Sequence, residues 1–273
     1  MSSDKAGHWY TSERAPAHKQ ENKSRPGETR PTTLRDAKAQ GLLPSVTTVI
    51  GVLDRPQLTT WKLEQVAAAA YGLVFIPKLQ YATLEDWTGF IIDQAFKQVE
   101  TAADLGIGIH AAIEAWAQGK PYDPAMTVYV EAVAKWAASE QVTFVSNEEV
   151  LVDPDHGYAG TTDATIACPR GKGILDFKSR KTKPGLPATP FDGQPMQVAA
   201  YHNAKFGSFA PDHVGVNLFI STTEPGRVDA TWYTSDQLQR EWSAFAHALA
   251  LWKHLKGYDP AAPVVAKAKP AKR

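Results

Sequence analysis

The chain has 273 residues, and its 29 basic and 29 acidic side chains give a formal net charge of zero at neutral pH. This balance offers no overall electrostatic support for a nucleic-acid partner, so any basic footprint has to be local. The single cysteine, Cys168, excludes an intramolecular disulfide, a four-cysteine zinc site and a four-cysteine iron–sulfur cluster.

No apolar run approaches the ~18 residues of a membrane-spanning helix, and residues 1–30 lack the apolar core of a secretory signal. We therefore expect a cytoplasmic protein with no membrane partner. Residues 1–40 are polar and mix Lys, Arg, Glu, Pro and Ser, which predicts a mostly disordered or loosely attached segment. A single folded domain is expected over 41–258, followed by a basic tail over 259–273.

The first part of this domain, residues 41–140, has the apolar spacing of helices. It opens with a short entry segment, Pro44–Ile50, in which Ser45 or Thr47 can cap the helix that follows. Four helices are then predicted, over Pro56–Tyr71, Thr83–Ala103, Leu105–Gln118 and Met126–Ser139.

The second part, residues 141–258, changes to strand patterns separated by turn signals. Three strands come first, at Val142–Val152, Tyr158–Ala167 and Gly173–Phe177. The helix Gly193–Phe206, two strands at Val214–Ser221 and Val228–Tyr233, and the helix Ser235–Lys256 follow. Thr234 and Gln237 have the spacing of a capping box at the start of this last helix. This order predicts an α/β fold: a mixed central β-sheet flanked by helices, with a helical N-terminal half.

Chemistry concentrates on two of the predicted strands. Gly160 and Asp163 lie in one strand, and Asp176 and Lys178 follow at the end of the next. Adjacent antiparallel strands can bring the two carboxylates together, and two close carboxylates repel unless a cation lies between them. Carboxylate oxygens suit Mg²⁺ or Mn²⁺, and residues two apart in a strand share a face. The pattern therefore predicts a metal site with an ammonium beside it.

An Asp-x-Lys triplet alone is weak evidence, because Asp36-Ala37-Lys38 repeats it in the polar N-terminal segment. On spacing alone, a solvent-facing ion pair at a strand end and a metal site are about equally good interpretations.

Further residues resemble the RecB-like branch of the PD-(D/E)XK nucleases. That branch has a Gly-x-x-x-His helix, a Gly-x-x-Asp strand, an apolar strand ending in Asp-x-Lys, and a helix with Gln-x-x-x-Tyr. Here Gly106 and His110 match the first motif, and Gln197 and Tyr201 match the last. Pro44–Ile50 is similar to the Pro-Ser-Val-Thr start of phage members and of the mitochondrial genome maintenance exonuclease.

The resemblance implies a PD-(D/E)XK restriction-endonuclease-like core and a role for each matched residue. The catalytic set would be Asp163, Asp176, Lys178, Gln197 and Tyr201. The metal ligands, for one or two Mg²⁺ or Mn²⁺ ions, would be His110, Asp163, Asp176 and the Phe177 backbone carbonyl, with Glu114 or Glu148 as additional candidates. Lys178 would orient or help deprotonate the attacking water in hydrolysis of a phosphodiester.

A local basic cluster flanks Asp176 and is the predicted DNA-binding surface, with a solvated basic loop as the alternative. Its members are Arg170, Lys172, Arg180, Lys181 and Lys183. The Pro-rich segment Thr182–Pro190 is expected to be a mobile loop over the cleft. Trp61 or Tyr71 is a candidate for stacking on a base, although core packing is the default for tryptophans.

The resemblance thus predicts a metal-dependent DNA exonuclease for single-stranded or free ends, in phage or bacterial recombination or DNA processing. A recombination or single-strand-binding protein would be a natural partner. Three alternatives stay open: a catalytically degenerate nucleic-acid-binding protein with a nuclease fold, a structure-specific endonuclease, and an unrelated metal-dependent hydrolase. No Walker motif is present, so a helicase–nuclease fusion is not expected.

Overall fold

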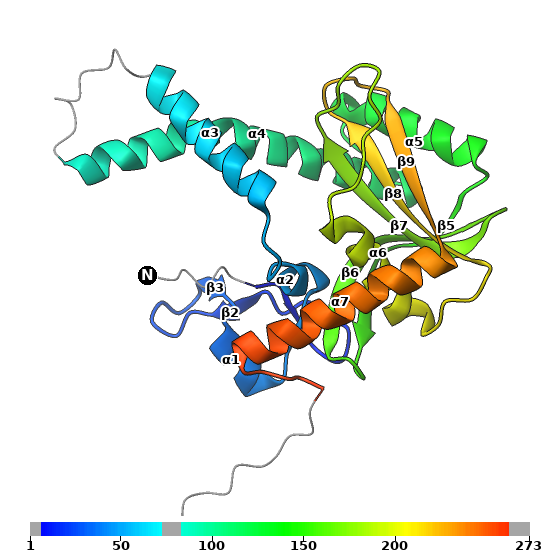
Figure 1. The fold of residues 1–273 in the computed structure, drawn as a ribbon, viewed down its shortest axis with the longest axis horizontal. Helices are drawn as coiled ribbons and strands as arrows, with labels where there is room; N and C mark the ends of the chain where they lie inside the picture. Colours follow the sequence, from blue (N-terminus) through cyan, green and yellow to red (C-terminus); the bar gives the residue numbers. More distant parts are fainter. Residues whose placement is uncertain (1–6, 73–82, 262–273) are drawn as a thin grey trace, which may run out of the picture.

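A five-stranded mixed β-sheet forms the centre of the computed structural model, which describes residues 7–72 and 83–261 (Figure 1). In spatial order the strands are β5 (Thr143–Asp153), β6 (Tyr158–Cys168), β7 (Gly171–Arg180), β8 (His213–Ser221) and β9 (Val228–Thr234). Neighbouring strands are antiparallel except β7 and β8, which are parallel. The parallel pair needs a crossover, and α6 (Gly193–Phe206) supplies it.

Helices cover both faces of this sheet and give it two cores. Helix α6 packs with α7 (Ser235–Lys256) on one face, where Ile174, Val198 and Phe245 are buried. The C-terminal part of α4 (Leu84–Ala117) and α5 (Thr127–Ser139) cover the other face, with Ile109 and Leu175 in that core. The predicted α/β class with a mixed sheet flanked by helices is confirmed.

The helical part differs from expectation in one respect: the two helices expected over Thr83–Ala103 and Leu105–Gln118 are one continuous helix, α4. No proline interrupts it, and single glycines inside a helix cost only about 1 kcal/mol each. Helix α3 (Pro56–Gly72) packs along the first half of α4, and the pair projects from the body (Figure 1). A 3₁₀ turn, η2 (Pro124–Met126), leads into α5.

The expectation of disorder over residues 1–40 is wrong for residues 7–40. Strand β1 (Trp9–Tyr10) pairs with β4 (Leu43–Pro44), and β2 (Lys19–Glu21) pairs with β3 (Thr29–Pro31). Helices α1 (Leu34–Gln40) and α2 (Val46–Ile50) complete the segment. Although the segment is mostly polar, a few of its apolar residues, such as Trp9 and Ala37, are buried in the core.

Trp9 is the main anchor of this segment. Only 3% of it is exposed, and its ring lies 6.0 Å from that of Trp252 and 6.4 Å from that of Tyr258. Residues 1–6 and most of the predicted basic tail, 262–273, lie outside the described residues. No helix among the described residues is long and apolar enough to cross a membrane.

Local signals at element boundaries are confirmed in two places. Ser45 accepts a hydrogen bond from the Thr48 amide and caps α2. Thr234 and Gln237 form the expected capping box of α7. Strand β7, by contrast, runs to Arg180 rather than ending at Phe177, because its pairing with β8 continues as far as Arg180 and Ser221.

Candidate active site

The candidate site lies where strands β6 and β7 separate. Their antiparallel ladder runs from Cys168 opposite Gly171 to Ala164 opposite Leu175. Continued by one step, this register places Asp163 opposite Asp176. There the Asp163 side chain replaces the ladder, because its Oδ2 accepts a hydrogen bond from the Phe177 amide at 2.6 Å. We call this point, where the β6–β7 ladder ends beyond Ala164 and Leu175, the fork. Both predicted carboxylates, Asp163 and Asp176, lie there.

Asp176 is held in one orientation by its neighbours. Only 2% of its side chain is exposed, and its Oδ2 accepts from Lys178 Nζ at 2.6 Å and from Asn217 Nδ2 at 2.8 Å. Asn217 faces Asp176 because the two are paired in the parallel β7–β8 register. Tyr233 in β9 donates in turn to Asn217 Oδ1 at 2.7 Å. Asn217 and Tyr233 are additional site residues that the sequence analysis did not identify.

The electrostatics of the fork favour a cation. Burial raises the pKa of Asp176 to about 6 and also raises the pKa of Asp163. Burial alone would lower the pKa of Lys178, but the negative charges of Asp176 and Asp163 outweigh it and leave that pKa raised. One ammonium thus faces two desolvated carboxylates, and carboxylate oxygens are the donors that Mg²⁺ and Mn²⁺ prefer.

His110 approaches the fork from helix α4. Its Nδ1 lies 3.8 Å from Asp163 Oδ1, and its ring meets the Phe177 ring edge-on at a centroid distance of 6.1 Å. Burial, followed by the charge of Lys178, lowers the pKa of His110 and favours the neutral ring that can bind a metal. Gly106, one turn earlier, allows this approach, since a Cβ there would lie 2.6 Å from Ser179 Oγ.

Glu148 joins the site from β5, whereas Glu149 points elsewhere. The β5–β6 pairing on both sides of Glu148 places it opposite Asp163. Burial raises the pKa of Glu148 to about 7, and the charges of Asp163 and Glu114 add to the effect. Glu149 instead pairs with Lys205 of α6 at 2.6 Å. The Glu148 carboxylate is thus affected by the charges of both Asp163 and Glu114.

Helix α6 contributes the predicted Gln197 and Tyr201. Gln197 Nε2 donates to the Tyr201 hydroxyl at 3.2 Å, and Tyr201 is buried. A Cβ on Gly160 would lie 2.6 Å from Tyr201 Cε1, so the glycine of β6 makes room for the ring. Tyr201 therefore packs between α6 and β6, and the accessible polar group on this side is Gln197.

The direction of the Phe177 carbonyl follows from the backbone geometry of β7. The amide of Phe177 points toward Asp163. Because the N–H and C=O of one strand residue point to the same side, its carbonyl oxygen also faces the fork.

The predicted basic cluster is divided between the two ends of β7. At the start of the strand, Arg170 pairs with Glu140 at 2.9 Å and Lys172 lies over the Phe206 ring. Lys172 precedes Lys178 by six strand residues, or about 20 Å. Arg180, Lys181 and Lys183 lie at the other end, beyond Lys178. Of the predicted set, Arg180, Lys181 and Lys183 therefore follow Lys178 at the same end of β7.

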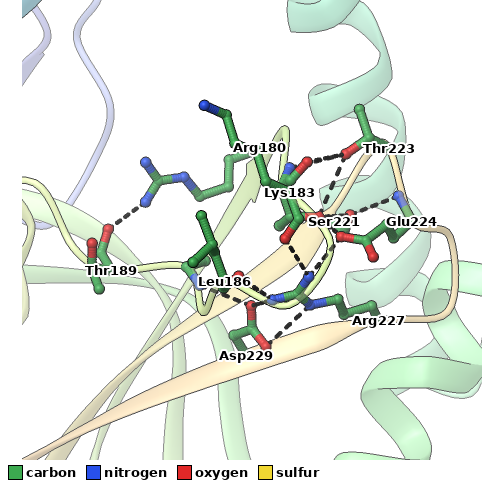
Figure 2. A network of polar contacts seen from close by, with 11 residues as sticks. Arg180, Lys183, Leu186, Thr189, Ser221, Thr223, Glu224, Arg227 and Asp229 are labelled. Atoms are coloured by element: carbon green, nitrogen blue, oxygen red, sulfur yellow. Dashed lines mark hydrogen bonds and ion pairs between the residues drawn. The ribbon is translucent and has the colours of Figure 1, made fainter.

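The segment Thr182–Pro190, expected to be mobile, is tethered by Arg227 (Figure 2). Arg227 forms ion pairs with Glu224 at 2.6 Å and with Asp229 at 2.8 Å. It also donates to the backbone carbonyls of Lys183 and Leu186. These contacts connect the loop to the β8–β9 turn, beside the end of β7.

Comparisons with known proteins add little. No family model and no curated protein matches the chain. One similar solved structure, described as the crystal structure of SSO0001, is 14% identical over 72% of this chain and 86% of that one, with a TM-score of 0.31. Among residues 7–72 and 83–261, no three His, Cys, Asp or Glu side chains are gathered into a ready-made metal site.

Proposed function

We propose that the chain is a Mg²⁺- or Mn²⁺-dependent deoxyribonuclease of the RecB-like PD-(D/E)XK type, acting on single-stranded or free DNA ends. The observation that carries the proposal is the fork. Asp163 and Asp176 meet there on adjacent strands, with the Lys178 ammonium 2.6 Å from Asp176 Oδ2. A solvent-facing ion pair does not account for an Asp176 side chain that is 2% exposed. A recombination or DNA-processing role follows from the resemblance.

In this proposal the fork holds the metal through carboxylate and imidazole donors. Asp163, Asp176, His110 and the Phe177 carbonyl would be the ligands, and Glu148 or Glu114 would serve a second ion. The metal would supply Lewis-acid activation of water and neutralise charge on the phosphoryl oxygens. Lys178 would hold the attacking water and stabilise charge that develops on the phosphate.

Three residues would act by positioning others. Asn217 orients the Asp176 carboxylate, and Tyr233 orients Asn217 through its hydroxyl. Gln197, held by the Tyr201 hydroxyl, would contact Lys178 or the phosphate from the α6 side. The Asn217–Tyr233 pair would keep the Asp176 carboxylate in place before substrate arrives, which is how such sites lower a barrier.

The test is cleavage of DNA labelled at its 5′ or 3′ end, as single strands, duplexes and closed circles, with Mg²⁺, Mn²⁺ or EDTA. We expect metal-dependent degradation of linear DNA and resistance of the circles, and the two labels give the polarity. Asp163→Asn should abolish cleavage. If no DNA or RNA is cleaved with either metal, the proposal is wrong and the degenerate-nuclease alternative takes its place.

A further inference from the structure

Phe191 is an exposed aromatic residue that contacts Arg180, the last residue of β7. It lies two residues before the start of α6, and 57% of it is exposed. The Arg180 guanidinium carbon lies 4.3 Å from the centre of its ring, which is a close cation–π contact. A large apolar side chain that is stacked but more than half exposed is poorly explained by core packing.

Hydrogen bonds position the Phe191 backbone and the Arg180 guanidinium. The Phe191 amide donates to Gln194 Oε1 at 2.9 Å, and its carbonyl accepts from the Gln194 amide at 2.8 Å. Arg180 donates to the Thr189 carbonyl in the loop that Arg227 fastens (Figure 2). The guanidinium also lies 5.3 Å from the ring centre of Phe219. The pair is therefore a guanidinium stacked on an aromatic ring, with hydrogen bonds to the guanidinium and to the backbone that carries the ring.

The Phe191–Arg180 pair lies along the same strand as Asp176, because Arg180 is the last residue of β7. Arg180 follows Lys178 by two residues and Asp176 by four on β7, so the three share one face of the strand. The distance from Asp176 to Arg180 along the strand is about 13 Å. A single strand whose phosphate lies at the fork would therefore have to run two or more nucleotides along this face of β7 before one of its bases reaches Phe191.

We propose that Phe191 and Arg180 form a stacking platform for a nucleobase of single-stranded DNA, two or more nucleotides along the strand from the phosphate at the fork. Stacking on an aromatic ring tolerates any base, because every base has a flat π face, and a nearby arginine adds a cation–π contribution. Exposed Lys181 lies next to Arg180 and can meet the backbone phosphates. The assignment of DNA as the ligand rests on the proposed function.

The other aromatic candidates are placed less well for this role. Trp61 packs against Phe96, with ring centres 6.5 Å apart, on the α3–α4 pair that projects from the body (Figure 1). Tyr71 lies on α3 as well. Neither is on the strand that carries Asp176 and Lys178.

The test measures binding of a fluorescent oligothymidylate to the full chain in EDTA, so that cleavage plays no part. Phe191→Leu keeps the apolar bulk but removes the ring, and we expect about a tenfold loss of affinity. Phe191→Trp should restore binding. Leu186→Ala is the matched control, because Leu186 is another exposed apolar residue of the same loop region, and it should bind normally.

An oligonucleotide with abasic sites separates stacking from phosphate contacts. We expect the wild-type chain to bind it about as weakly as Phe191→Leu binds oligothymidylate, with no further loss in the variant. Equal binding of both oligonucleotides by the wild-type chain, or an unchanged Phe191→Leu, overturns the platform even if the chain cleaves DNA. Base-dependent binding through Phe191 without cleavage supports the platform and overturns only the nuclease.

Discussion

Neutralising Asp176 should make the metal-free protein more stable, although it destroys the proposed site. Asp176→Asn keeps the shape of the side chain, and its carbonyl oxygen can still accept from Asn217 and Lys178. It removes a negative charge that burial disfavours, and burial raises the pKa of Asp176 from 3.8 to about 6.

The magnitude follows from that change in pKa. Each pKa unit corresponds to about 1.4 kcal/mol, so an ionised Asp176 lowers the free energy of unfolding by on the order of 3 kcal/mol above pH 6. Because the folded-state pKa is the higher one, the folded protein binds more protons between pH 4 and 6. The contribution of Asp176 to the free energy of unfolding therefore falls as pH rises through this window, and the gain from Asp176→Asn should grow through the same window.

Urea unfolding in EDTA, at pH 4 and at pH 7, measures this difference. We expect wild type and variant to be nearly equal at pH 4, and the variant to be more stable by a few kcal/mol at pH 7. Added Mn²⁺ should stabilise the wild-type chain and have little effect on the variant. A variant that is equally or less stable than wild type at pH 7 would refute the reasoning.

Three further substitutions test other parts of the account. Asp36→Ala, in the second Asp-x-Lys triplet, should lower the free energy of unfolding by about 1 kcal/mol through loss of the α1 capping box. DNA cleavage should be unchanged, and a loss of cleavage would contradict the assignment of Asp176 and Lys178 as the active triplet. Burial, followed by the charge of His213, lowers the pKa of His202 from 6.5 to about 3. As pH falls, His202 is therefore protonated in the unfolded chain before it is protonated in the folded one. Its contribution to the free energy of unfolding should fall below about pH 6.5. In urea titrations His202→Phe should reduce that acid dependence, by up to about 1.4 kcal/mol per pH unit, whereas an unchanged slope would exclude His202 as its source. Arg227→Gln should release loop 182–190, seen as faster tryptic cleavage there; an equally resistant loop would show that other contacts hold it.

The elements of the folded core were predictable because their signals are local. Apolar spacing locates helices and strands, and Thr234 with Gln237 marks the start of α7 from four residues alone. The N-terminal segment was misjudged because its order depends on a distant partner. Trp9 is buried against Trp252 of α7, and no local pattern in a polar segment reveals such a contact.

Some residues of the candidate site also have a local sequence signal, whereas others depend on distant contacts. Asp163, Asp176 and Lys178 were candidates from their strand positions and from the resemblance, but the contact between them depends on where the β6–β7 ladder ends. Asn217 gave a signal that was overlooked, since a buried amide in an otherwise apolar strand requires a polar partner. Phe191 gave none, because its role depends on the position of Arg180 across the loop.

The central claim is that the fork hydrolyses phosphodiesters with Lys178 at its centre. The most direct test is the single-turnover rate of DNA cleavage by Lys178→Ala at saturating Mn²⁺, with Mn²⁺ binding measured on the same sample. We predict retained metal binding and a rate lower by about 10²- to 10⁴-fold, as expected for loss of a group that assists proton transfer or stabilises charge. A near-normal rate with metal bound would contradict the account.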